Sequence, residues 1–152
     1  MRQQPAQITK SESKTLKAGY SGTPLAKKLG IKDGFNLRFV NAPAELDKEL
    51  DLPANVTINA RARKPIDVVL LFVTSKRELE RTFSSYAAKL RPTGMLWICW
   101  PKKTSGVASD LSDNAVRELG LAKGMVDVKV CAINEVWSGL KFVIRVKDRP
   151  KN

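Results

Sequence analysis

Two long apolar runs dominate the hydrophobic pattern of the chain. The first, IDVVLLFV, spans residues 66–73, and the second, GMLWICW, spans residues 94–100. Continuous β-branched and aliphatic runs of this length are typical of strands buried on both faces, as in a parallel sheet covered by helices. The pattern therefore predicts that these two segments lie side by side in the middle of a sheet, with helices on both faces.

A capping box follows the first apolar run and predicts the start of a helix. Ser75 can accept a hydrogen bond from a free backbone N–H, and Glu78, three residues later, can reach back for another. Apolar residues then recur on one helical face, which predicts a helix over 76–91 that Pro92 ends.

Shorter helices are predicted elsewhere from their end signals. Ser112 caps a segment that Gly120 would end, and Thr23 caps a segment that Gly30 would end. A third short helix, over 44–50, follows Pro43 and turns its leucines inward.

The remaining pattern predicts two strands before the first apolar run and a hairpin at the end. Residues 35–43 alternate and 55–62 form a weaker, more polar strand. The runs 126–133 and 140–146 also alternate, with Val126, Val128 and Val130 on the packed side of the first run and a turn at Ser138-Gly139. This order predicts a three-layer Rossmann-like α/β sandwich, with a mostly parallel sheet and a C-terminal antiparallel hairpin. We expect residues 20–148 to form this single domain, after a flexible basic tail over 1–19 and before a basic end over 149–152.

Composition adds a strong basic bias. The 152 residues carry a formal charge of +12, concentrated near both ends and at 61–64. Such a surface attracts polyanions without choosing among them, so nucleic-acid binding is one alternative function. Its candidate residues are Lys27, Lys28, Arg61, Arg63 and Lys64.

Several chemistries are excluded or disfavoured. The chain has no histidine, so no Ser-His-Asp or Cys-His pair exists within it. Cys99 and Cys131 lie in apolar runs and are expected to be buried reduced thiols. The acidic residues of 45–51 match no calcium loop and indicate a solvated helix face, so no metal site is predicted. No run is long enough to span a membrane, and we expect a cytoplasmic protein.

The segment after the second apolar run is a candidate anion site. Ligand crevices in open α/β sheets form at the carboxyl ends of strands. The loop supplies lysines, hydroxyls and a glycine there, and neighbouring segments supply a helix start and an aromatic wall; the candidates are Lys102, Lys103, Thr104, Ser105, Gly106, Ser75, Trp137 and Ser138. The alternative interpretation is a solvated loop, with Trp137 a packed anchor of the hairpin.

Five segments together resemble a known family. TPLAKKLGIKDG, DVVLLFV, GMLWICWPKKTSG, ELGL and WSGLKFV, in this order over residues 23–144, resemble a small bacterial family catalogued as a domain of unknown function. The resemblance implies a Rossmann-like domain and assigns no reaction. The order of elements is also similar to the later part of a class I methyltransferase.

The residues that would bind a nucleotide cofactor argue against one. The turn after the first strand, residues 41–44, contains no glycine, and Arg61 and Arg63 follow the second strand where an acidic residue would hold ribose hydroxyls. We therefore expect no dinucleotide or S-adenosylmethionine in the usual manner. The sequence favours a non-catalytic binding module for an anionic small molecule or a protein partner. A second alternative is an enzyme using Lys102, Lys103, Ser138 or Cys99, and the hairpin edge could pair two chains.

Overall fold

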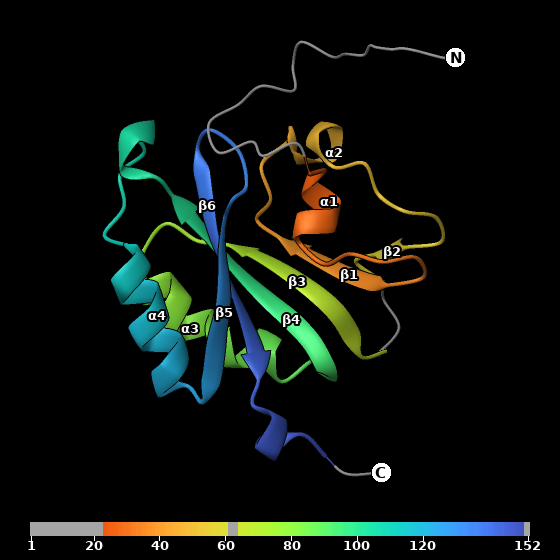
Figure 1. Cartoon of the computed structure of the whole chain (residues 1–152). Coiled ribbons are helices and arrows are strands. Elements are labelled where there is room, and N and C mark those ends of the chain that lie inside the picture. Colours follow the sequence, from red (N-terminus) through yellow and green to blue (C-terminus); the bar gives the residue numbers. More distant parts are fainter. Residues whose placement is uncertain (1–22, 61–63, 151–152) are drawn as a thin grey trace.

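The computed structural model describes residues 23–60 and 64–150. Its six strands form one sheet in the order β2-β1-β3-β4-β6-β5 (Figure 1). The strands are β1 (Asn36–Val40), β2 (Thr57–Ile58), β3 (Ile66–Phe72), β4 (Leu90–Pro101), β5 (Met125–Ala132) and β6 (Trp137–Ile144). Strands β2, β1, β3 and β4 are parallel, whereas β6 is antiparallel to both β4 and β5. This architecture confirms the predicted Rossmann-like α/β fold with an antiparallel C-terminal hairpin.

The two apolar runs form the centre of the sheet, as predicted. All seven residues of β3 are buried, and β3 pairs with β4 through Val69 and Leu96. Strand β3 and residues 96–101 of β4 are buried on two faces because helices cover the sheet on both sides. Burying a large aliphatic side chain contributes about 1.5–3 kcal/mol, so these strands are the main source of stability.

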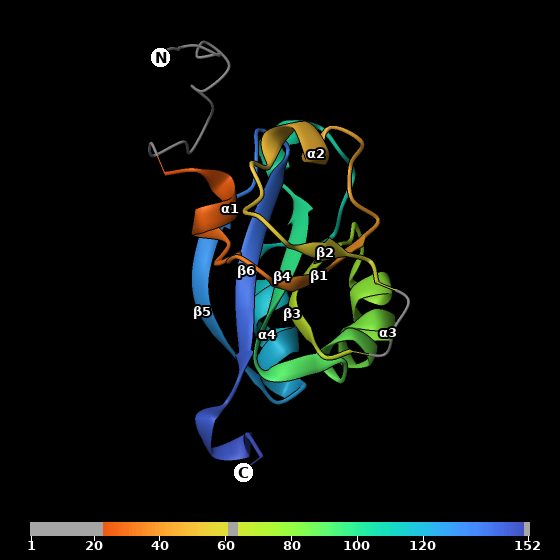
Figure 2. The same cartoon turned by 90° about the vertical axis from the view of Figure 1, so that its right-hand side faces the viewer.

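The helices divide between the two faces of the sheet (Figure 2). Helices α3 (Lys76–Ala87) and α4 (Asp113–Ala122) cover one face, and the single turns α1 (Leu25–Lys28) and α2 (Leu46–Glu49) cover the other. Trp97 is buried on the side of α1 and Trp100 on the side of α3, as their odd spacing predicts.

Helix α3 ends earlier than predicted. It ends at Ala87 rather than near residue 91, and β4 already begins at Leu90. Pro92 lies within β4, where the pairing with β3 is interrupted between Ile66 and Val68. Proline is tolerated at such an irregularity because no ladder hydrogen bond is required of it.

The predicted ends of two other helices also need correction. Helix α1 begins after Pro24 without a side-chain cap, so Thr23 does not cap it, although Gly30 has the expected left-handed φ of 83°. Helix α4 continues past Gly120 to Ala122. Gly120 is needed for packing instead, since a Cβ there would lie 2.0 Å from the ring of Phe142.

The hairpin forms, and Leu140 and Phe142 of β6 are buried as predicted, but the packed face of β5 is not the predicted one. Val128 and Val130 are 55% and 49% exposed, because the pairing of β5 with β6 shifts between Asp127 and Lys129. A bulge of this kind reverses which side chains face the core. The predicted turn at Ser138-Gly139 is also wrong, since both residues pair within β6.

Cys99 and Cys131 are free, buried thiols, as expected. They pair with opposite sides of the same residue of β6, Gly139. The predicted basic tail over 1–19 lies outside the described residues. No helix in the described part of the chain is long and apolar enough to cross a membrane.

Candidate functional site

The strand order reverses direction between β1 and β3. From β1 the chain proceeds to β2 on one side and then to β3 on the other. In open α/β sheets, ligands bind in the crevice at the carboxyl ends of the two strands where this reversal occurs. We call the carboxyl ends of β1 and β3, residues 40–42 and 73–75, the switch point.

A single carboxylate joins the two strand ends at the switch point. Glu78 accepts the Thr74 backbone N–H at 3.2 Å with one oxygen, and the Asn41 side-chain Nδ2 at 3.3 Å with the other. Ser75 caps α3 by accepting the Glu78 N–H at 3.1 Å. The Ser75 half of the predicted capping box therefore forms, while Glu78 accepts from Thr74, one residue before the N-cap, and also fixes the end of β1.

Asn41 gives the turn after β1 a shape that usually requires glycine. Its φ is 58°, in the left-handed region that asparagine adopts more readily than most residues. The absence of glycine from residues 41–44 therefore does not prevent a tight turn at the switch point.

The predicted anion loop is held largely by its own backbone and hydroxyl. Residues Lys103–Ser105 form a 3₁₀ turn, which Gly106 ends with a φ of 82°. The Ser105 hydroxyl donates to the Lys102 carbonyl at 2.7 Å and accepts the Val107 N–H at 3.1 Å. This geometry accounts for Ser105 and Gly106 structurally, and a ligand at this loop stays a prediction.

The structure places Trp137 beside this loop. Trp137 pairs with Pro101 at the end of β4, and the neighbouring Lys102 N–H donates to the Val136 carbonyl at 2.7 Å. The Trp137 ring packs edge-on against Phe72, with ring centroids 5.0 Å apart. Trp137 thus acts as a packed anchor, whereas Ser138 lies one residue further along, opposite Trp100.

The other predicted candidates are dispersed. Lys27 and Lys28 belong to α1, and Lys64 is exposed just before β3, while Arg61 and Arg63 lie outside the described residues. Complete burial raises the pKa of the Cys99 thiol well above its usual range. A buried thiol of this kind is protonated and unreactive, so it is no candidate nucleophile.

Sequence reasoning missed a groove beside the switch point. The groove has a volume of about 530 Å³ and is lined by Arg38, Phe39, Val40, Asn41, Asn59, Ala60 and Tyr86. Arg38 alternates with apolar residues along β1, a pattern that sequence alone interprets as a solvated position. We call these seven lining residues the Arg38 groove.

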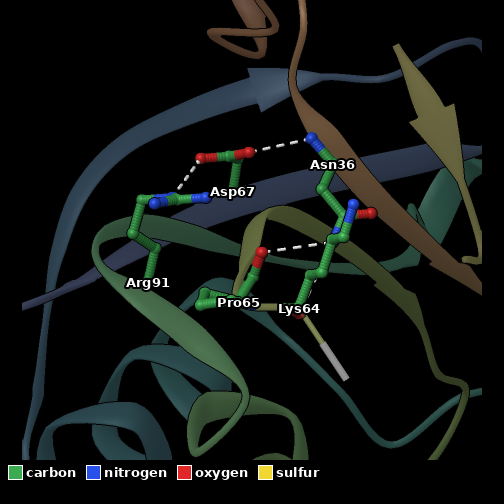
Figure 3. A network of polar contacts seen from close by, with 5 residues as sticks. All are labelled: Asn36, Lys64, Pro65, Asp67 and Arg91. Atoms are coloured by element: carbon green, nitrogen blue, oxygen red, sulfur yellow. Dashed lines mark hydrogen bonds and ion pairs between the residues drawn. The ribbon is translucent and has the colours of Figure 1, made fainter. Parts of the chain in front are cut away.

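A second polar cluster lies at the opposite, amino-terminal edge of the sheet (Figure 3). The buried Asp67 carboxylate accepts the Asn36 backbone N–H and the Arg91 Nε, each at 2.8 Å. The Asn36 side chain donates to the Pro65 carbonyl at 3.1 Å. Both carboxylate oxygens of Asp67 have a partner within the protein, so this cluster joins β1, β3 and β4 and serves the fold.

Comparison with solved structures identifies the class of fold. The chain is similar to a SAM-dependent methyltransferase from Aquifex aeolicus, with 13% identity and a TM-score of 0.53 over 78% of this chain and 86% of that one. It is similar to the precorrin-6y C5,15-methyltransferase of Geobacter metallireducens, with 12% identity and a TM-score of 0.51 over 79% and 85%. It also resembles Aeropyrum pernix fibrillarin, solved with S-adenosyl-L-methionine bound, with 10% identity and a TM-score of 0.52 over 78% and 73%. No protein-family model and no curated sequence relative matches the chain.

These likenesses correct two predictions. The resemblance to an uncharacterised bacterial family finds no support, whereas the likeness to class I methyltransferases holds for the fold. The prediction of a non-catalytic binding module is contradicted, because the solved proteins that share this fold are methyltransferases. Neither these likenesses nor the described residues support nucleic-acid binding or a homodimer.

The site does not fit S-adenosylmethionine in the usual manner. A carboxylate at the end of the second strand normally accepts the ribose hydroxyls of an adenosine cofactor. Here Asn59 follows β2, and its Oδ1 accepts the Phe39 N–H at 2.9 Å. No aspartate or glutamate lines the Arg38 groove.

Proposed function

We propose that the protein is an enzyme with the methyltransferase fold that binds an adenosine-containing co-substrate at the switch point. The observation that supports this proposal most directly is the left-handed Asn41 turn at the reversal between β1 and β3, beside an open groove. A turn of this shape lets backbone N–H groups approach a ligand, and the methyltransferases that share the fold make an adenosine-type co-substrate the first choice.

Two variants of Asn41 separate the backbone turn from the side chain. Asn41→Gly keeps the left-handed φ and removes the hydrogen bond to Glu78, whereas Asn41→Val disfavours that φ because valine is β-branched. We expect adenosine to bind the wild type and Asn41→Gly with similar affinity in isothermal titration calorimetry, and Asn41→Val at least about 10-fold more weakly, a loss of about 1.4 kcal/mol.

Uridine is the matched control, because it carries the same ribose with a different base. If adenosine binds the wild type no better than uridine does, the proposed co-substrate is wrong.

The enzymatic part is tested separately by incubating the protein with S-adenosylmethionine and a bacterial small-molecule extract. Release of S-adenosylhomocysteine that Asn41→Val abolishes would support catalysis and would show that the site accepts an unphosphorylated ribose. No protein-dependent release would count against methyl transfer from S-adenosylmethionine.

A further inference from the structure

The Arg38 groove lies between β1, the end of β2 and the last turn of α3. Its lining includes Val40 and Asn41 of the switch point, Asn59 and Ala60 after β2, and Tyr86 of α3. No helix lies between β2 and β3 in the described residues 57–60 and 64–72. Among the described residues, α3 borders this part of the sheet face and supplies Tyr86 to the groove.

Arg38 is held in the groove with part of its guanidinium group unpaired. Its Nη2 donates to the Ala60 carbonyl at 3.4 Å, close to the limit of a hydrogen bond. Its Nε is buried, and no described group pairs with it. Leaving a buried donor of a charged group without an acceptor costs at least about 1–3 kcal/mol, so the fold holds this guanidinium group in place at a real cost. Because protein atoms cover Nε, a ligand in the groove would bind the outer Nη nitrogens of Arg38.

The seven lining residues of the groove include one positive charge and no negative charge. Arg38 supplies a fixed positive charge, and the Asn59 amide and the Tyr86 hydroxyl also line the groove, but no carboxylate does. The nearest acid by contact, Glu78, already accepts from Thr74 and from Asn41. The two Nη nitrogens of an arginine form a planar fork that matches a phosphate group, because two parallel N–H groups can donate to two phosphate oxygens.

We propose that the adenosine co-substrate carries a phosphate on its ribose and that Arg38 binds this phosphate. The inference rests on the proposed function, because it concerns the ribose end of the same ligand. Nucleotide sites of α/β proteins hold a free ribose diol with an acid after the second strand, and a ribose phosphate with a nearby arginine. This chain lacks the acid and has the arginine. The contact between Arg38 and the phosphate thus determines which co-substrate binds, in place of a contact between an acid and the ribose diol.

Calorimetric titrations with adenosine, adenosine 2′-monophosphate and adenosine 3′-monophosphate test the inference at one fixed salt concentration. We expect one of the two phosphates to raise affinity for the wild type at least about 10-fold over adenosine, or about 1.4 kcal/mol. Arg38→Gln should abolish this gain, and Arg38→Lys should lose most of it because lysine lacks the planar fork. Arg81→Gln, at an exposed position of α3, removes the same charge and should keep the gain.

The outcomes separate this inference from the proposed function. Equal affinity for adenosine and both phosphates, unchanged in Arg38→Gln, would overturn the phosphate site and leave the adenosine site standing. Failure of every adenosine compound to bind would overturn both. Ribose 5-phosphate or inorganic phosphate binding as tightly as the nucleotides would also overturn the inference, because the site would then recognise an anion alone. If Arg38→Gln fails to fold by circular dichroism, the comparison of the wild type with Arg38→Lys decides the same question.

Discussion

At the scale of single residues, Gly120 shows how a residue can be absolutely constrained by packing inside a helix. Three ring atoms of Phe142 lie 2.0 to 2.7 Å from the position of a Cβ at residue 120. The ring is itself fixed, because it is fully buried and packs edge-on against Phe83. Glycine at this position therefore permits the close approach of α4 to β6.

Gly120→Ala should destabilise the protein although alanine is the better helix former. Relief of the glycine penalty would contribute about 0.5–1 kcal/mol, but overpacking against a fixed ring costs about 1–3 kcal/mol. We expect a net loss in urea unfolding monitored by circular dichroism. In a double-mutant cycle, Phe142→Leu should make the loss caused by Gly120→Ala smaller. Additive effects of the two substitutions would mean that the ring is not the obstacle.

At the scale of elements, the hairpin carries a repulsive pair that the bulge brings into register. Lys129 of β5 is directly opposite Lys141 of β6, whose Nζ lies 5.9 Å from the centroid of the Trp97 ring. Partial burial lowers the pKa of Lys141, and the charge of Lys129 lowers it further. Like charges placed directly across two strands destabilise a sheet.

Lys129→Gln should therefore stabilise the protein at neutral pH, by about 0.2–1 kcal/mol. The gain should shrink in high salt, which screens the repulsion. Because the folded pKa of Lys141 lies below its unfolded value, wild-type stability should rise as the pH approaches the unfolded lysine pKa of about 10.4. Between pH 7 and pH 10, the free energy of unfolding measured in urea should rise less for Lys129→Gln than for the wild type.

Lys147→Gln provides the control for net charge. Lys147 lies in the exposed 3₁₀ turn Val146–Asp148, beyond the end of β6. If both substitutions change stability equally, the effect comes from the overall charge of +12 and the cross-strand pair contributes nothing.

The sequence predicts well those elements that are marked either by an unbroken apolar run or by a cap formed between neighbouring residues. The runs around Val69 and Leu96 are continuously apolar over 68–73 and 94–100, so an error of register does not change the prediction. The Ser75 and Ser112 caps each need only the next three residues. Val128 was placed on the wrong face because a bulge depends on the partner strand. The place of Arg38 in a groove is not predictable from sequence for a related reason, because it depends on β2 and α3, which are distant in sequence.

At the scale of the whole molecule, the sheet should have a graded stability from its centre to its edges. Strands β3 and β4 pair on both sides and are covered by helices, whereas β2 has two exposed residues and β5 has three exposed residues in a row. Buried central strands open only in global unfolding, while edges open locally.

Native-state hydrogen exchange read by NMR should reveal this gradient. The amides of residues 68–71 should exchange at least about 100-fold more slowly than those of β2, and at the rate expected for global unfolding. Urea at low concentration should speed exchange at the centre, because global unfolding exposes surface, and should leave the edge amides almost unchanged. Equal protection across the sheet would contradict a core organised around these two strands.

The position of Gly139 between the two thiols has a practical consequence. A residue of an intervening strand separates Cys99 from Cys131, so their Cα atoms are two strand spacings apart, about 9–10 Å. A disulfide bridges Cα atoms no more than about 7 Å apart. The native chain therefore cannot crosslink itself in air, and the protein should keep one covalent form whether it is purified with or without a reducing agent.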